Sequence, residues 1–103
     1  MTTTQNQYDQ PKLLYYSVSD TSFVTGDSPV TLDVNATLLR NSIDGYIMND
    51  GAGSFTVNLS QDGSTFGNDI LINNGESFSL KTISIDKIKI TWIADSSYRV
   101  FAV

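Results

Sequence analysis

The chain has 103 residues, and eleven acidic against six basic side chains give it a net charge of −5 at pH 7. This length is typical of one domain, and the 40% hydrophobic content is enough for a modest core. The cations are scattered singly, which argues against a nucleic-acid surface. Without Cys or His, disulfides, thiolate catalysis, Ser-His-Asp catalysis and the usual transition-metal sites are excluded.

The first residues are polar and rich in Thr, Gln and Asn. Such a composition buries too little surface to order itself, so we expect residues 1–11 to be a flexible N-terminal arm and residues 12–103 to be the single domain. The arm is either an ordinary frayed terminus or a segment that folds onto a neighbouring subunit. Residues 1–10 lack a basic start and an apolar run, so no signal peptide is visible. No apolar run approaches the roughly 20 residues of a membrane helix.

The first predicted strand spans Lys12 to Ser19, where aromatic and branched residues are dense. Its two adjacent tyrosines must face opposite sides, which leaves one of them on an outer face unless something covers it. If the arm and this strand contact a partner, the candidate residues are Tyr8, Pro11, Tyr15 and Tyr16.

The next segments are less regular. Asp20 to Ser28 is predicted to be a loop containing a short strand, and Val30 to Val34 alternates like a half-exposed strand. Helix formers are concentrated in Ala36 to Ser42, but the segment is too short for a helix that is stable alone. We expect a strand or a single helical turn between two layers here.

From Gly45 onward the pattern predicts a meander of short strands. Phe55, Val57 and Leu59 alternate with polar residues, the two-residue period of a half-buried strand. Asp-Gly and Asn-Gly turns suggest hairpins that pair Tyr46–Met48 with Ser54–Ser60, and Ile70–Ile72 with Ser77–Leu80.

Near the end of the chain the apolar residues change from odd-numbered to even-numbered positions. Ile83 and Ile85 share one parity and Ile88 resumes the other, which predicts a bulge or bend at Asp86–Lys87. The last strand is expected from Tyr98 to Val103. Strands spaced every 8 to 12 residues predict an all-β fold, an antiparallel β-sandwich of jelly-roll or Ig-like type with about eight strands.

Residues that could carry chemistry have simpler structural explanations. Most Asp residues lie in expected turns, where they cap backbone amides, and Glu76 begins a strand beside a turn. Calcium would suit the oxygen-rich turns at Asn49-Asp50-Gly51 and Asn68-Asp69, although neither has a recognised ligand spacing. Trp92 shares a face with Ile88 and Ile90 and is expected in the core. We therefore expect no enzyme activity and no cofactor.

Only 17% of the residues are charged, and the outer strand faces are rich in Asn, Ser and Thr. Neutral polar faces can be buried against partners without leaving a charged side chain buried and unpaired, so this composition favours a component of a larger assembly. Alternatively, Trp92, Tyr46, Tyr98 and the Tyr15/Tyr16 pair could be stacking platforms for a glycan.

Three segments of the C-terminal two-thirds resemble small β-sandwich structural proteins of tailed bacteriophages. They are residues 45–51 (GYIMNDG), 55–63 (FTVNLSQDG) and 74–80 (NGESFSL). The resemblance implies a non-enzymatic virion protein, made in the host cytoplasm, that decorates or stabilises a capsid. Its expected partners are the major capsid protein or other virion proteins, with homo-oligomerisation possible. The alternative function is a glycan-binding module or a tail, fibre or junction component.

Overall fold

The computed structural model describes residues 14–103 of the chain. Tyr8, Pro11 and all of the expected arm, residues 1–11, therefore lie outside the described residues. Nearly all of the regular secondary structure in the described part is β-strand, as the alternating pattern predicts. No helix in residues 14–103 is long and apolar enough to cross a membrane.

Eight strands, one short α-helix and one turn of 3₁₀ helix make up the fold. In chain order the elements are β1 (Tyr16–Phe23), η1 (Thr25–Asp27), β2 (Val30–Asp33), α2 (Val34–Leu38), β3 (Gly45–Asn49), β4 (Phe55–Ser60), β5 (Ile70–Ile72), β6 (Ser77–Ser79), β7 (Lys87–Trp92) and β8 (Ser96–Ala102).

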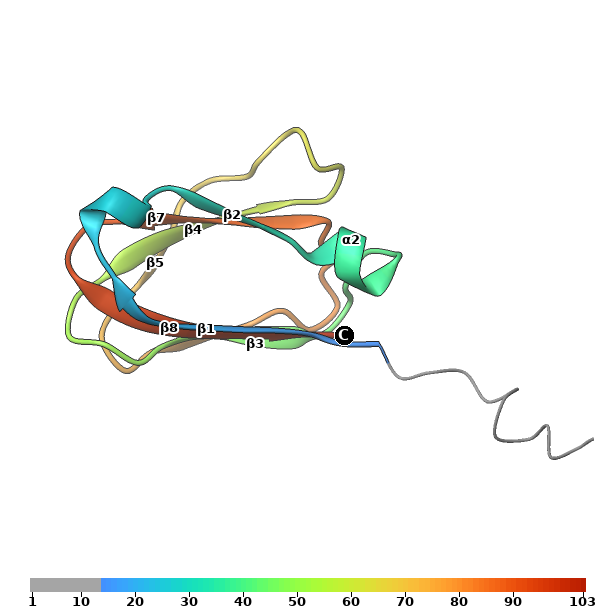
Figure 1. The fold of residues 1–103 in the computed structure, drawn as a ribbon. Coiled ribbons are helices and arrows are strands. Elements are labelled where there is room, and N and C mark those ends of the chain that lie inside the picture. Colours follow the sequence, from blue (N-terminus) through green and yellow to red (C-terminus); the bar gives the residue numbers. More distant parts are fainter. Residues whose placement is uncertain (1–13) are drawn as a thin grey trace, which may run out of the picture.

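The strands form two antiparallel sheets that lie face to face (Figure 1). The β1 sheet has the order β1-β8-β3-β6, and the β2 sheet has the order β2-β7-β4-β5. Consecutive strands mostly alternate between the sheets, whereas an Ig-like sandwich keeps its first two strands in one sheet. The order is that of a jelly roll built from two Greek keys, so the predicted β-sandwich is confirmed.

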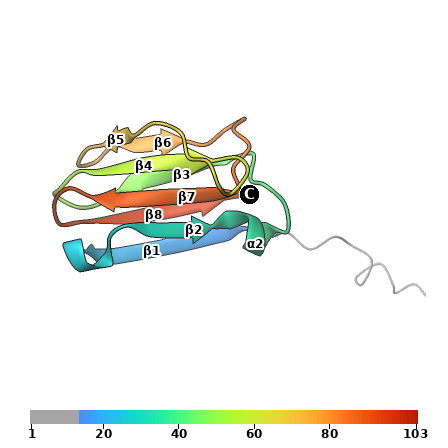
Figure 2. The same cartoon turned by 90° about the horizontal axis from the view of Figure 1, so that it is seen from above.

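Two predicted hairpins are wrong. Tyr46–Met48 belongs to β3 in the β1 sheet, whereas Ser54–Ser60 contains β4 of the β2 sheet. Likewise, β5 and β6 lie in different sheets, although Asn73-Asn74-Gly75 connects them. In Figure 2, seen from above, β3 and β4 overlap, and Figure 1 shows that they lie in opposite layers. The physical reason is that a tight glycine turn reverses the chain equally well within a sheet or across a sandwich.

Asn49 holds one of these crossings in place. Its side chain is 1% exposed and donates hydrogen bonds to the Gly53 carbonyl at 2.7 Å and the Ile72 carbonyl at 3.0 Å. Its Oδ1 accepts bonds from the Gly51 amide at 3.0 Å and the Ser96 hydroxyl at 2.7 Å. One buried amide therefore joins segments of both sheets at the end where the chain crosses.

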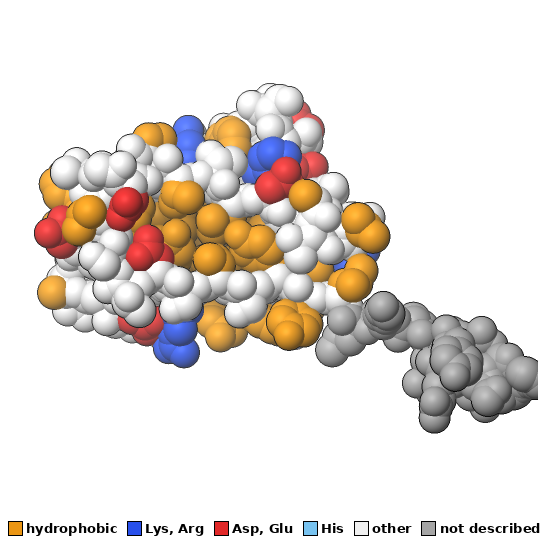
Figure 3. All heavy atoms as spheres, in the orientation of Figure 1, with side chains coloured by type: hydrophobic (Ala, Val, Ile, Leu, Met, Phe, Trp, Pro, Cys, Tyr) orange, Lys and Arg blue, Asp and Glu red, His pale blue; other side chains and the backbone are white. Residues whose placement is uncertain are grey.

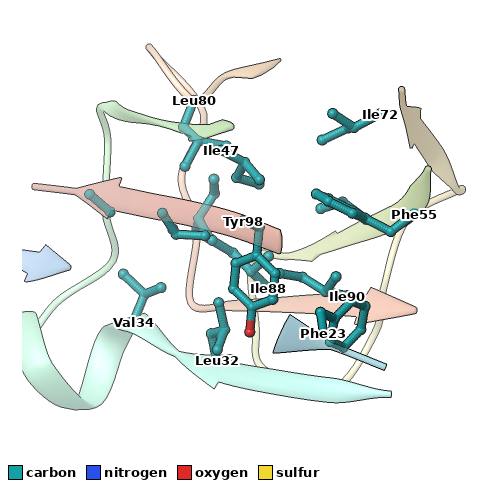
Figure 4. Packing of buried hydrophobic residues seen from close by; sticks show 14 of the residues in the cluster. Phe23, Leu32, Val34, Ile47, Phe55, Ile72, Leu80, Ile88, Ile90 and Tyr98 are labelled. Carbon is teal, nitrogen blue, oxygen red and sulfur yellow. The ribbon is translucent and has the colours of Figure 1, made fainter. Parts of the chain in front are cut away.

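The core lies between the sheets and draws on both (Figure 4). Toward the end of the sandwich where β1 ends, three aromatic rings meet edge to face, with centroids 5.4 to 6.3 Å apart, the geometry that aromatic pairs prefer. These rings belong to Phe23 and Tyr98 of the β1 sheet and Phe55 of the β2 sheet. Burial raises the pKa of Tyr98 to about 12, because the phenolate would lose its hydration.

Three local expectations have clear outcomes. The Ala36–Ser42 region contains a helical turn, α2, which connects the layers and is anchored by buried Val34 and Leu38. The backbone bends at Asp86, as the parity shift predicts. The loop predicted over Asp20 to Ser28 is wrong in its first part, because β1 continues to Phe23 across a register shift that follows Asp20, whereas residues 24–28 lie between β1 and β2 and contain η1. Burial of Phe23 in the aromatic cluster keeps this polar segment in the sheet.

Candidate functional site

The outer face of the β1 sheet carries a row of stacked aromatic rings, which we call the aromatic face: Tyr15, Phe101 and Tyr46. Phe101 lies on β8 directly opposite Tyr46 of β3, and Tyr15 immediately precedes β1. The Phe101 ring centroid is 6.0 Å from that of each tyrosine, with interplanar angles of 26°. Three strands that are adjacent only in the folded sheet thus build one row.

The aromatic face is open to solvent. Tyr15 is 54% exposed and Tyr46 is 39% exposed, while Phe101 between them is half-buried. Figure 3 shows hydrophobic side chains along the lower margin, which is the outer side of the β1 sheet in this orientation. Most aromatic side chains gain free energy on burial, so an exposed row of this kind is a feature expected of a binding surface.

An ion pair borders the aromatic face along the sheet. The Arg99 guanidinium donates to both carboxylate oxygens of Asp50, at 2.6 and 3.1 Å, and its Nη2 lies 2.9 Å from the Met48 sulfur. The hydrogen bond to Asp50 raises the pKa of Arg99, with the charge of Asp50 adding to the effect. Both side chains are substantially exposed to solvent, so this ion pair contributes little to stability.

Neutral polar side chains cover much of the remaining outer surface of this sheet. Serines occupy the outward positions of β1, β6 and the start of β8. These residues are Ser17, Ser19, Ser77, Ser79 and Ser97. A hydroxyl surface around an aromatic row can be covered by a partner without desolvating an ion.

The structure places the two described candidate residues on opposite sides of β1, as the adjacency of Tyr15 and Tyr16 predicts. Tyr15 belongs to the aromatic face, whereas Tyr16 is half-buried against the core. Burial raises the pKa of Tyr16, and the charge of Asp33 adds to this shift. The other two candidates, Tyr8 and Pro11, lie outside residues 14–103.

Phe101 was missed by the sequence argument, which named only tyrosines and Trp92 as platforms. The signal was present, because Tyr98, Val100 and Ala102 alternate inward and leave Phe101 facing outward. Of the other proposed platforms, Tyr98 is buried, and Trp92 packs partly against the core. The Trp92 indole nitrogen donates to Asp95 at 2.9 Å.

The acidic residues singled out in the sequence are engaged locally. Glu76 accepts a hydrogen bond from the Asn73 amide at 2.8 Å, the turn role expected of it. In the two oxygen-rich turns, Asp50 pairs with Arg99, and Asp69 accepts a bond from the Asn58 side chain at 2.7 Å. Within residues 14–103 no group of three or more acidic side chains is placed to hold a metal ion.

Two shallow hollows lie away from the aromatic face. One of about 340 Å³ lies beneath the segment between β4 and β5, beside Leu59, Asp62 and Phe66. The other, of about 300 Å³, lies at the end of the sandwich beside Thr21, Gly51 and Asp95.

No protein-family model matches the chain, and no curated protein is detectably similar to it in sequence. Among solved structures, the crystal structure of PirA superposes with a TM-score of 0.45 and 11% sequence identity, over 91% of this chain and 96% of its own. A likeness at this level carries no argument about function.

Proposed function

We propose that the protein is a non-enzymatic structural component of a bacteriophage virion, which decorates or stabilises the capsid by docking its aromatic face on neighbouring virion proteins. The exposed Tyr15–Phe101–Tyr46 row carries the proposal. Interface hot spots are enriched in large aromatic side chains whose burial excludes water, and tyrosine orders at low entropic cost.

The surroundings of the row support protein contact. Serines flank it, and Arg99 of the same sheet is already paired with Asp50, so docking over this pair leaves neither charge without its partner. Jelly rolls occur in viral capsid proteins, which agrees with this proposal as a fold-level analogy only. The resemblance to phage structural proteins points the same way.

The first test is the composition of the particle. Virions of the phage that carries this gene are purified by density-gradient centrifugation and analysed by quantitative mass spectrometry. We expect the chain to be enriched with the major capsid protein through successive gradients. Recovery of the chain only in the soluble lysate would rule out a virion component.

The second test addresses the surface. Particles lacking the protein are mixed with wild-type chain, the double variant Tyr15→Ser/Tyr46→Ser, or Leu71→Ser. Leu71 is a matched control, because it is 54% exposed on the outer face of the other sheet. We expect the double variant to bind about tenfold more weakly or worse, and Leu71→Ser to bind like wild type. Equal binding of all three would show that docking uses another surface.

Glycan binding is the second candidate, since the same exposed rings could stack against a sugar. Titration of the isotope-labelled chain with a glycan panel, followed by NMR, separates the two. Shifts confined to residues around Phe101, and abolished by Tyr46→Ser, would favour the glycan module. An unresponsive spectrum across the panel would leave protein docking as the function of this face.

A further inference from the structure

The sandwich is open along the side where β1 and β2 form the two sheet edges. Apolar side chains from both strands face this opening and are only partly buried against the core: Tyr16, Val18 and Val30. Figure 3, which looks onto this side, shows hydrophobic side chains gathered between the two layers. On the opposite side the edges are β5 and β6, which have only three residues each.

Among the described strands β1 pairs only with β8, so its other side is a sheet edge. At eight residues it is the longest edge strand of the described sheets, and antiparallel geometry directs alternate N–H and C=O groups away from β8. Proteins usually protect such edges with Lys, Pro or bulges. β1 contains no Lys, Arg or Pro, and its register shift comes only after Asp20, so Tyr16–Asp20 remains a regular, accessible edge.

We propose that this edge pairs antiparallel with β1 of a second copy, around a two-fold axis at Val18, to give one continuous sheet across the dimer. A two-fold contact needs a self-complementary surface. In this register Val18 faces Val18, Ser17 faces Ser19, and Tyr16 faces Asp20 of the other copy. The apolar pair lies inside the opening, and the serines meet on the outer face.

Charge placement favours this register. Asp20 is the one charged residue of β1, and the Val18 axis separates the two copies of Asp20 by four residue positions. At the rise of a strand this is about 13 Å, beyond the screening length of about 8 Å at physiological salt. An axis nearer Asp20 would place the two Asp20 carboxylates side by side. Their repulsion therefore favours an axis in the N-terminal half of β1.

The size of the contact suits a reversible dimer. With the axis at Val18 the two copies pair over Tyr16–Asp20, a length of about 17 Å, and a two-layer sandwich with its side chains is about 20 Å thick. Pairing would therefore bury on the order of 700 Å² in total, the size of a weak, transient contact. The axis is perpendicular to the sheet, so both aromatic faces would point the same way and could bind one lattice bivalently.

The test is the mass of the full chain by light scattering and sedimentation equilibrium across a concentration series. We expect a dimer of twice the 11.3 kDa chain mass at high concentration. Ser17→Lys/Ser19→Lys places like charges opposite each other twice and should weaken dimerisation about tenfold. Ser17→Lys/Ser19→Glu places opposite charges there and should retain the dimer. Ser77→Lys/Ser79→Lys, on the far edge of the same sheet, is the matched control.

Wild-type chain that remains monomeric at every concentration would overturn the proposal, as would equal weakening by the two Ser17/Ser19 double variants. Loss of the dimer on deleting residues 1–13, with Ser17→Lys/Ser19→Lys having no effect, would assign the contact to that segment instead. The mass measurement does not depend on virions, so it can fail or succeed independently of the proposed function.

Discussion

At the scale of single residues, buried polar side chains decide how the chain crosses between sheets. The Asn49 side chain makes four hydrogen bonds, to the β3–β4 turn, β5 and the start of β8. Its nitrogen donates two of them and its oxygen accepts the other two. Every buried side-chain nitrogen or oxygen in residues 14–103 has a hydrogen-bond partner. Removing one such partner leaves the other buried groups without a hydrogen bond, and the resulting loss of stability exceeds the net contribution of the bond itself.

We predict that Asn49→Ala lowers the free energy of unfolding by about 3 kcal/mol, because carbonyl and hydroxyl groups around it lose their partner without access to water. Urea unfolding followed by circular dichroism measures the change. Asn74→Ala, an exposed position in the β5–β6 turn, is the control and should stay within about 0.5 kcal/mol of wild type. A similar small effect at both positions would contradict the bridging role of Asn49.

Asp62 gives a prediction in pH. Hydrogen bonds from the Thr65 and Ser64 amides, at 2.7 and 2.8 Å, lower the pKa of Asp62 to about 2 from its ordinary 3.8. The unfolded chain therefore binds a proton more readily, and this contribution to stability is complete above pH 4 and is lost as the pH falls toward 2. Carbon-detected NMR titration should give a midpoint near 2. A midpoint near 3.8 would show that the turn does not hold in solution.

At the scale of elements, outer faces are shaped by the connections that cover them. Asn58 and Ser60 point outward from β4, as the alternation predicts, yet they are 7% and 1% exposed. The segment from Gln61 to Asp69 folds back over them. The Asn58 amide donates to the Gly67 carbonyl at 2.9 Å, and the Gly63 amide donates to the Ser60 hydroxyl at 2.8 Å. The β2 sheet is thus partly covered where the β1 sheet is open.

The end of α2 contains a local strain. Leu39 caps the helix in the left-handed region, with φ of 62°, although its side chain is 80% exposed and contributes little burial. We predict that Leu39→Gly raises the free energy of unfolding by roughly 0.5 to 1 kcal/mol, since glycine adopts this conformation without a Cβ penalty.

The matched control is Ile43→Gly, at a residue that is 61% exposed and has no positive φ. That substitution should destabilise the fold by about 0.5 to 1 kcal/mol through backbone entropy. Thermal unfolding of both variants compares the signs directly. The Leu39 interpretation fails if both substitutions change stability in the same direction.

At the scale of the whole molecule, the first and last strands are neighbours. β1 pairs with β8 over most of its length, and the buried hydrophobic residues run from Phe23 to Ala102. Pairing of strands so distant in sequence makes folding slow for the size of the chain, in the range of milliseconds to seconds.

We predict that deleting residues 1–13 changes the free energy of unfolding by less than about 0.5 kcal/mol, because the buried core of the described residues is formed by side chains from Phe23 to Ala102. Urea unfolding of the shortened chain checks this. Deletion of residues 1–23 is the contrast, because it removes β1 and Phe23 and should abolish cooperative unfolding. A large loss of stability from the shorter deletion would show that residues before Leu14 contribute to the fold.

For the candidate site, as for the fold, one part follows from the sequence and another part requires the tertiary structure. That one of Tyr15 and Tyr16 faces outward follows from strand alternation alone. That Tyr15 and Tyr46 enclose Phe101 requires β8 to lie between β1 and β3, and the three segments are far apart in the chain. No spacing in the sequence predicts that order, which is why Phe101 was missed.

By itself, the sequence determined the all-β class, most strand positions, which side chains of a strand face the core, and the turn roles of Asp and Glu76. These depend on interactions within a few residues, so local period and turn chemistry carry them. Only the tertiary structure decided which sheet each strand joins, the aromatic row and the open β1 edge. Those depend on packing between distant segments, where one turn serves two topologies and burial of residues such as Phe23 and Asn49 selects between them.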